Sequence, residues 1–231
     1  MNAQIPLPKK QTAAFTLIEL LTVIAIIAIL MGLLFPALSG AKKQARRADA
    51  GVGVRNIVNA CKNYYNDYGK FPPVTGALDG TKSYLSFGDI SAGGCAVTND
   101  QLFDILRAND KGASSVNASH ALNKRQVKYF EMGKAKDPKN PRSGFVDGNE
   151  FSGTKGQLMD PWGAQYCIVL DAADAGSLDL SKFYTDIKDV VRVSAASFSM
   201  GEDNKRGGKG YEKQFRKPNS SEAPDDIVSW Q

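Results

Sequence analysis

The stretch Phe15–Phe35, FTLIELLTVIAIIAILMGLLF, decides the fold of this chain of 231 residues. As an α-helix these 21 residues would be roughly 31 Å long, which is enough to cross the hydrocarbon core of a membrane once. Its one charged residue is Glu19, whose carboxylate would cost about 2.5 to 3.5 kcal/mol at mid-bilayer and less near a helix end. The stretch therefore predicts a membrane-spanning helix with an acidic group that needs a partner.

Basic residues flank this stretch on both sides, with Lys9 and Lys10 before it and Lys42, Lys43, Arg46 and Arg47 after it. Counted by the positive-inside rule alone, they would favour a cytoplasmic carboxy-terminal side. We give more weight to Glu19, which needs a positively charged partner, than to this count of basic residues. If the chain were cut just before Phe15, the new amino group would lie one helical turn from Glu19, within pairing reach.

The segment Phe15–Glu19, followed by an Ile/Leu/Ala-rich helix and Pro36, resembles the class-3 prepilin signal of type IV pilins and type II secretion pseudopilins. The resemblance implies that a prepilin peptidase cuts between Ala14 and Phe15 on the cytoplasmic face and methylates the new amine of Phe15. It also implies that Glu19 and Pro36 serve assembly, Pro36 by kinking the helix. The family usually has Gly where this chain has Ala14, so a small residue is kept.

An ordinary secretory signal peptide is the alternative, because Ala37-Leu38-Ser39 offers small residues at a cleavage position. A glutamate inside the apolar region argues against it. The apolar region is also longer than the usual 7 to 15 residues.

A second apolar pattern follows at the helical spacing i, i+3, i+4, i+7, and it ends at Gly69 and Pro72-Pro73. Its positions are Val54, Ile57, Val58, Cys61, Tyr64, Tyr65 and Tyr68. We expect one long helix over 15–68, with a flexible segment at Gly51 and Gly53. The predicted organisation is a leader over 1–14, a transmembrane and assembly helix over 15–35, an amphipathic continuation over 36–69 and a globular domain over 70–231.

The first part of the globular domain, 74–157, is rich in Gly, Ser, Asn and Lys and predicts long loops. Within it, Asn99–Ala108 predicts a short helix capped near Thr98 or Asn99. The small apolar cluster Val127–Met132 predicts a strand or a turn of helix packed on the core.

The second part, 160–231, begins with the turn Asp160–Gly163 and an alternating strand from Tyr166 to Leu170. The run Val190–Met200 predicts its antiparallel partner. Trp162 is expected to fill the core or anchor the turn rather than line a ligand site. The expected fold class is α+β: a pilin-like fold in which a long amino-terminal helix packs on a small antiparallel sheet with long loops.

Acidic residues lie at both ends of a Gly-rich carboxy-terminal loop, in Ser199–Asn204 and Asp225–Trp230. Carboxylates and carbonyls suit calcium, but the basic residues between them would repel a cation, so composition favours an exposed polar loop. Together with the Asp160–Gly163 turn, these segments resemble the major pseudopilin of type II secretion, in which this loop binds calcium. The resemblance implies the following calcium ligands: Asp203, Asp226, the carbonyls of Met200 and Ser229, and more weakly Asp225.

The net charge of the whole chain, +5, equals the net charge of Lys124–Arg142 alone. This segment contains seven basic residues and two acidic ones, Glu131 and Asp137. A solvated loop explains this local excess, and nucleic acid is not expected as a partner. The single histidine, His120, and the absence of a Gly-x-Ser-x-Gly motif argue against a hydrolase. One disulfide is open to the chain in an oxidising compartment, without a choice of pair among Cys61, Cys95 and Cys167.

The resemblance implies a structural subunit of a type II secretion pseudopilus rather than an enzyme. It also implies a single-pass protein of the inner membrane, with a cytoplasmic amino terminus and a periplasmic globular domain. The resemblance implies these partners: other copies of the chain in a helical filament, a prepilin peptidase, the inner-membrane secretion machinery and minor pseudopilins. The alternative is a type IV pilus or DNA-uptake subunit, in which Lys124–Arg142 would meet DNA phosphates.

Overall fold

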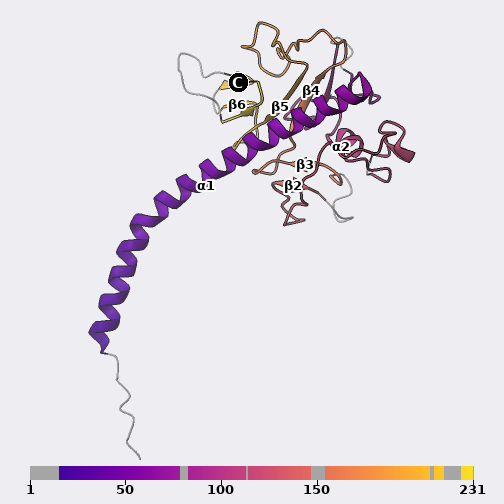
Figure 1. Cartoon of the computed structure of the whole chain (residues 1–231). Helices are drawn as coiled ribbons and strands as arrows, with labels where there is room; N and C mark the ends of the chain where they lie inside the picture. Colours follow the sequence, from indigo (N-terminus) through magenta and orange to yellow (C-terminus); the bar gives the residue numbers. More distant parts are fainter. Residues whose placement is uncertain are drawn as a thin grey trace, which may run out of the picture. The chain divides into compact units, whose positions relative to one another are not determined.

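The structure, a computed structural model, describes residues 16–78, 83–112, 114–146, 154–208, 211–215 and 225–230. Helix α1 spans Leu17–Tyr68 (Figure 1). The chain forms two compact units, Met1–Gln44 and Ala45–Gln231. The division falls within α1, so the part of α1 that follows Gln44 belongs to the globular unit.

Within the globular unit, α1 buries the predicted stripe. Val54, Ile57, Cys61 and Tyr64 are at most 1% exposed, because their helical spacing places them on one face. The helix ends where the sequence predicts, at Gly69, whose N–H donates to the Tyr65 carbonyl at 2.7 Å.

The main sheet is antiparallel throughout, with the strand order β1-β4-β5-β8. Its strands are β1 (Tyr84–Phe87), β4 (Cys167–Asp171), β5 (Ala195–Ser199) and β8 (Ile227–Val228). The predicted pair is confirmed as β4 and β5, with Ile168 opposite Ser197. The long helix and the small antiparallel sheet confirm the predicted α+β, pilin-like fold.

Both faces of this sheet are covered. The face toward α1 carries Leu85, Ile168 and Leu170, which join the α1 stripe in a helix-side core. On the opposite face Cys167 and Val169 belong to a far-side core, because successive side chains of a strand point to opposite faces. The far-side core also contains Tyr84, Cys95, Leu178, Leu180, Phe183, Tyr184, Ala196, Phe198, Met200 and Phe215.

Smaller elements complete the described parts of the globular unit. The predicted short helix is α2 (Asp100–Leu106), and a 3-10 turn, η1, spans Ala118–His120. Two further antiparallel pairs are β2 (Gly144–Phe145) with β3 (Leu158–Met159), and β6 (Gly207–Gly208) with β7 (Tyr211–Glu212).

Asn99 occupies the predicted cap position of α2, but its side chain does not cap the helix. Its amide group instead bonds the backbone of Leu158 and Tyr166. Asn99 thereby ties the start of α2 to β3 and to the entrance of β4.

Two predictions about strands need correction. Val127–Met132 is neither a strand nor a turn of helix: the N–H groups of Tyr129 and Phe130 both donate to the Leu106 carbonyl at the end of α2. That carbonyl has no partner inside its own helix, so the segment is used as a cap. The run Val190–Met200 becomes strand only from Ala195.

The region predicted as loop also contains strands. β1 and β2 lie within 74–157, and β8 lies in the carboxy-terminal loop. All four residues of β1 are buried, so the apolar–polar alternation that marks a strand in the sequence is absent.

Candidate functional site

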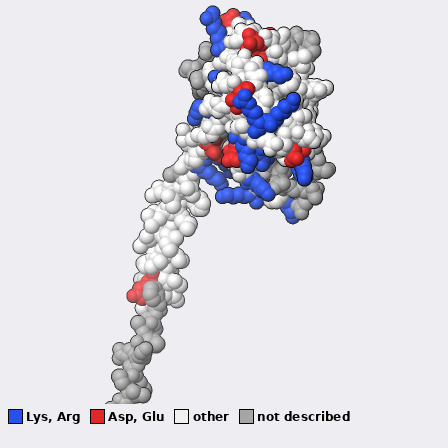
Figure 2. All heavy atoms as spheres, turned by 45° about the vertical axis from the view of Figure 1, so that its right-hand side comes forward, with Lys and Arg blue, Asp and Glu red and all other residues white. Residues whose placement is uncertain are grey.

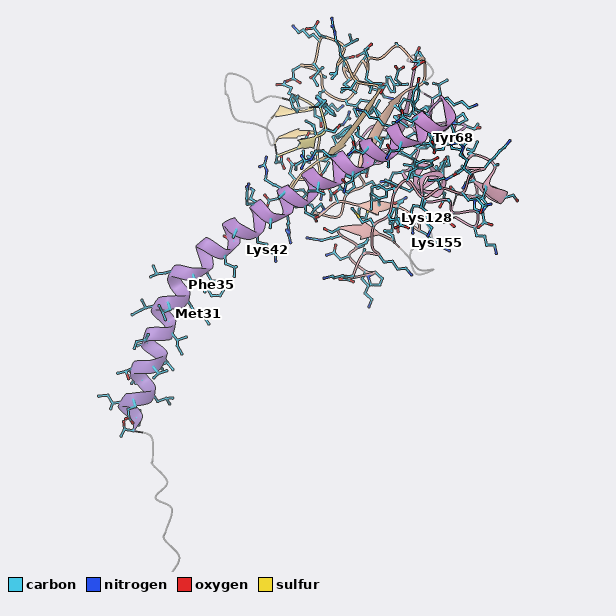
Figure 3. The ribbon with its side chains drawn as sticks, in the orientation of Figure 1. Met31, Phe35, Lys42, Tyr68, Lys128 and Lys155 are labelled. Carbon is cyan, nitrogen blue, oxygen red and sulfur yellow. The ribbon has the colours of Figure 1, made fainter. Side chains whose placement is uncertain are left out.

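The amino-terminal part of α1 presents an apolar surface. Its large hydrophobic side chains between Leu17 and Phe35 are between 45% and 81% exposed within the chain. They lie all around the helix because nearly every residue of this stretch is apolar; Met31 and Phe35 are labelled in Figure 3. Figure 2 shows this surface almost free of charged atoms. Among the described residues, α1 is the one helix long and apolar enough to cross a membrane.

Glu19 lies in the first turn of α1 and forms a reciprocal pair with Thr16. The Thr16 N–H and hydroxyl donate to one Glu19 carboxylate oxygen at 2.8 and 2.7 Å. In return, the Glu19 N–H donates to the Thr16 hydroxyl at 3.3 Å. This is a capping box, in which a Thr-x-x-Glu sequence satisfies the free donors at a helix start.

This capping box was not predicted, although the Thr-x-x-Glu spacing is its sequence signature. The other predicted sites at this end are less fully described. Ala14 and Phe15 lie outside the described residues, and Pro36 lies inside α1. The kink at Pro36 therefore stays a prediction.

Residues 9–35 match the family model of the prokaryotic N-terminal methylation motif. The chain carries a type IV pilin-like prepilin signal. This signal implies processing by a prepilin peptidase and assembly into a filament, and the apolar α1 fits the single-pass membrane anchor typical of pilins. No match was found among curated proteins or among solved structures.

The carboxy-terminal acidic loop is the second candidate site. Asp225 reaches back across the loop, and its carboxylate accepts the N–H groups of Glu202 and Asp203 at 2.9 and 3.2 Å. This close approach requires Gly201, which has φ +70° and where a Cβ atom would lie 2.5 Å from the Asp225 carbonyl oxygen. The two acidic segments that the sequence singled out are therefore brought together.

Asp226 is buried beside them. One carboxylate oxygen accepts the Tyr184 hydroxyl at 2.6 Å and the Gly207 N–H at 2.8 Å. The other, Oδ1, is buried without a hydrogen-bond partner in the described part of the chain. Burial raises the pKa of Asp226 to about 7, and the nearby carboxylates of Asp225 and Asp203 add to the shift.

As a calcium site, this loop fits in part. The orphaned oxygen of Asp226 suits a cation, and both Asp203 and Asp225 lie near enough to act on its charge. However, no three acidic, His or Cys side chains within the described ranges form a metal-binding group. Two residues were expected to supply carbonyl oxygens to the ion. Of these, Met200 is buried, and Ser229 pairs with Ser197 through its N–H and hydroxyl groups.

The turn Asp160–Gly163 holds this loop in place. The buried Asp160 carboxylate accepts the N–H groups of Trp162, Gly163 and Ala164 at 2.8 to 2.9 Å. Its other oxygen accepts the Ser199 hydroxyl at 2.6 Å, at the end of β5. Trp162 is 7% exposed, as expected for a residue that fills the core or anchors the turn.

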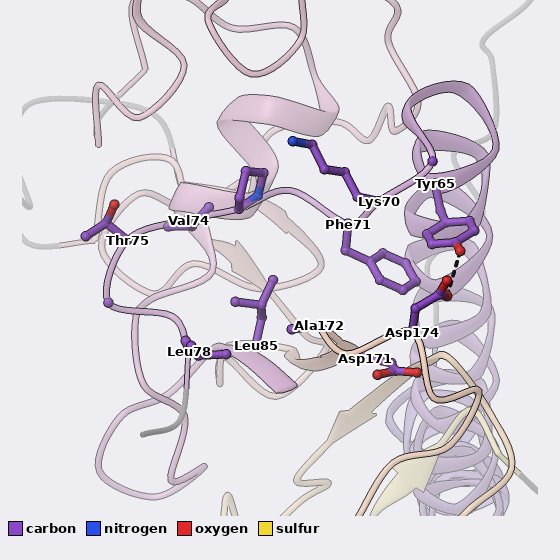
Figure 4. Close-up of a pocket in the computed structure, with 13 residues that line it drawn as sticks. Tyr65, Lys70, Phe71, Val74, Thr75, Leu78, Leu85, Asp171, Ala172 and Asp174 are labelled. Atoms are coloured by element: carbon purple, nitrogen blue, oxygen red, sulfur yellow. Dashed lines mark hydrogen bonds between the residues drawn. The ribbon is translucent and has the colours of Figure 1, made fainter. Parts of the chain in front are cut away.

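A largely apolar hollow of about 460 Å³ lies where α1 ends and is shown in Figure 4. Two carboxylates line it. Asp174 accepts the Tyr65 hydroxyl at 2.6 Å, and Asp171 accepts the N–H groups of Ala173 and Gly176. Since both carboxylates hold the loop after β4, their hydrogen bonds give them a structural role.

The basic segment Lys124–Arg142 is partly fixed to the globular unit. Arg125 pairs with Asp67 on α1 at 3.3 Å, and the Tyr129 hydroxyl donates to the same carboxylate at 2.6 Å. Figure 2 shows basic and acidic side chains interspersed on the visible face.

Proposed function

We propose that this chain is a structural subunit of a type II secretion pseudopilus that supports protein export, and not an enzyme. It is made as a precursor, cut between Ala14 and Phe15, methylated at Phe15 and assembled from the inner membrane. One observation carries the proposal: a methylation motif over 9–35 coincides with the apolar first part of α1, 17–35, whose large side chains are exposed and in which Glu19 is the one charged residue.

The physical basis is the uncovered apolar surface of α1. Large apolar side chains that are half exposed or more must be covered by lipid or by other apolar helices. In the membrane, lipid covers them. In a filament, the helices of neighbouring copies take the place of lipid, and Glu19 then pairs with the new amine of a neighbouring Phe15.

The membrane orientation follows from the same chemistry. Cleavage on the cytoplasmic side leaves the amino terminus there and the globular unit in the periplasm. The inner-membrane secretion machinery and minor pseudopilins are the partners that this arrangement requires. Resemblance of the Asp160–Gly163 turn and the Asp225–Trp230 segment to the major pseudopilin favours the secretion system over a pilus.

Calcium is proposed as the ion of the carboxy-terminal loop. Asp226 and Asp203 would supply carboxylate oxygens, Met200 and Ser229 carbonyl oxygens, and Asp225 a further carboxylate. A bound divalent cation would offset the repulsion that the charges of Asp225 and Asp203 exert on Asp226.

A type IV pilus or DNA-uptake subunit is the second candidate, and one feature favours it. Four cations surround a hollow of about 110 Å³ whose described lining contains no acidic side chain: Arg107, Lys111, Lys134 and Lys155. Arg107 stacks on the Phe145 ring at 3.9 Å. Such a site suits a phosphate group, so DNA binding by the full chain that falls steeply with salt would support this candidate.

The main proposal is tested at the amino terminus. Mass spectrometry of the chain from membranes that contain a prepilin peptidase should find a methylated Phe15 as the first residue. Membranes that lack the peptidase should contain the uncut precursor. An amino terminus near Gly40, or an uncut chain in both membranes, would overturn the proposal.

The choice between a pseudopilus and a pilus needs a second readout. Deletion of this subunit should stop the export of folded proteins across the outer membrane while DNA uptake continues. The reverse result would favour the second candidate.

A further inference from the structure

The three cysteines lie on two different sides of the main sheet. Cys61 is part of the α1 stripe in the helix-side core. Cys95 and Cys167 both belong to the far-side core. Because β4 separates the two cores, Cys61 cannot reach the other two thiols, and the structure selects one pair.

The two far-side thiols are neighbours in the same core. Burial raises the pKa of the Cys95 thiol, and a hydrogen bond with the Cys167 side chain raises it further. Both residues are at most 4% exposed, so solvent does not separate them.

The backbone around the pair is held closely. After β1, the loop 88–95 folds over Cys167, and a Cβ atom on Gly88 would lie 2.8 Å from the Cys167 Cα. A Cβ atom on Gly93 would lie 2.4 Å from the Cys167 sulfur. The Cys95 N–H then donates to the Asp89 carbonyl at 3.1 Å. Glycine at both positions is what allows the loop to bring Cys95 against β4.

Arg206 fixes the loop from the other side. Its guanidinium donates to the carbonyls of Ala92, Lys182 and Phe183 at 2.8 to 3.2 Å. The loop that carries Cys95 is therefore also positioned by a contact that does not involve the cysteines, and the two thiols lie in one core without a covalent bond between them.

We propose that Cys95 and Cys167 form a disulfide when the globular unit is in an oxidising compartment. The compartment rests on the proposed function, whereas the choice of pair rests on the geometry of the far-side core.

The oxidant is a disulfide, either glutathione disulfide or a protein disulfide. One cysteine thiolate attacks it, forms a mixed disulfide and releases the first thiol. The second cysteine attacks the protein sulfur of the mixed disulfide and releases the second thiol. The chain loses two electrons and two protons, and the oxidant takes up both.

Burial controls when this happens. Desolvation, opposed by the Arg206 charge, raises the pKa of the Cys95 thiol. Since the thiolate is the nucleophile, the folded pair reacts slowly. Oxidation takes place during folding or local opening, and the bond then ties the loop 88–95 to β4.

The test uses the full chain in detergent, reduced and then held in a glutathione redox buffer with a sub-denaturing concentration of guanidinium chloride. Remaining thiols are alkylated and the chain is digested with trypsin. The three cysteines fall in three different peptides, 56–62, 83–107 and 156–182. The expected product is 83–107 joined to 156–182, with alkylated Cys61 in the third peptide.

Matched variants complete the test. Cys61→Ser should retain the cross-linked peptide, whereas Cys95→Ser and Cys167→Ser should each lose it. Three alkylated cysteines in the wild-type chain, a bond that includes Cys61, or glutathione on Cys95 alone would overturn the proposal.

A second arm separates this proposal from the proposed function. The same peptide map is made from cells whose thiols are trapped with acid before lysis. A cross-link in the purified chain together with free thiols in cells supports the geometry and contradicts a periplasmic globular unit. A cross-link in both supports the geometry and the location together.

Discussion

The Thr16 hydroxyl and the Glu19 carboxylate lie 2.7 Å apart at the start of α1. Because the Thr16 N–H donates to the same carboxylate, a single acidic group satisfies two donors at the helix terminus. The Glu19 carboxylate, which is unusual in a membrane-spanning segment, therefore also stabilises the start of the helix.

Thr16→Ala should fray the first turn of α1. Loss of a Thr cap typically costs about 1 kcal/mol. Amide hydrogen exchange in micelles should become faster at residues 17–20. Thr22→Ala is the matched control, since the Thr22 hydroxyl donates to the Glu19 carbonyl within the helix and caps nothing. Equal exchange in both variants would contradict the capping box.

Glu19→Leu should block filament assembly while the precursor is still inserted and cut. The substitution removes the acidic partner that the proposed function assigns to a neighbour's amine. Sheared filaments and the processed subunit are measured by immunoblot. Unchanged filament yield would sink the proposed pairing.

Gly53→Ala should destabilise the globular unit. A Cβ atom at Gly53 would lie 2.3 Å from the Tyr166 hydroxyl oxygen, and the Tyr166 side chain is buried. Overpacking of this kind costs about 1 to 3 kcal/mol, more than the gain of about 1 kcal/mol in helix propensity.

Gly51→Ala is the control for that variant, because its Cβ would meet only ordinary contacts at 3.6 Å or more. It should raise the melting temperature, and Gly53→Ala should lower it, as followed by near-UV circular dichroism. Two stabilised variants would contradict the close contact between Gly53 and Tyr166 and would favour the prediction that both glycines form a flexible segment.

Asp160→Ala should lower the free energy of unfolding by about 3 kcal/mol. The change leaves three backbone N–H groups and the Ser199 hydroxyl without their acceptor in a buried site. Asp137→Ala is the control, since the exposed Asp137 accepts one local N–H bond from Lys139 and its loss should change stability by less than about 0.5 kcal/mol. Denaturant titration of both variants in detergent gives the comparison.

Calcium at millimolar concentration should raise the melting temperature of the full chain in detergent, because a ligand that binds the folded state stabilises it. Asp203→Ala should remove the shift, and magnesium should not reproduce it. A melting temperature unaffected by calcium would reject the ion.

The features predicted correctly from the sequence are those with a local signal. The apolar block, the stripe from Val54 to Tyr68 and the alternation from Tyr166 to Leu170 each repeat within a few residues. The methylation motif is also contiguous, which is why residues 9–35 match a family model.

The missed features depend on contacts between distant residues. β1 is buried on both faces and pairs with β4 more than eighty positions later, with Tyr84 opposite Asp171. Spacing in the sequence also cannot show that Asp225 folds back onto the N–H groups of Glu202 and Asp203. The contact between Gly53 and Tyr166 was missed for the same reason, since helix propensity considers the helix alone and not the side chains packed against it.

The contact of Gly53 with Tyr166 also restricts how α1 can dock on the sheet. A sliding or turning helix would bring a residue with a Cβ atom to this point, where the buried Tyr166 ring leaves no space. Gly53 therefore fixes how the carboxy-terminal part of α1 is rotated against the sheet of its own domain. A polymer built from repeated copies gains from this, because every globular unit holds its own segment of helix in the same way.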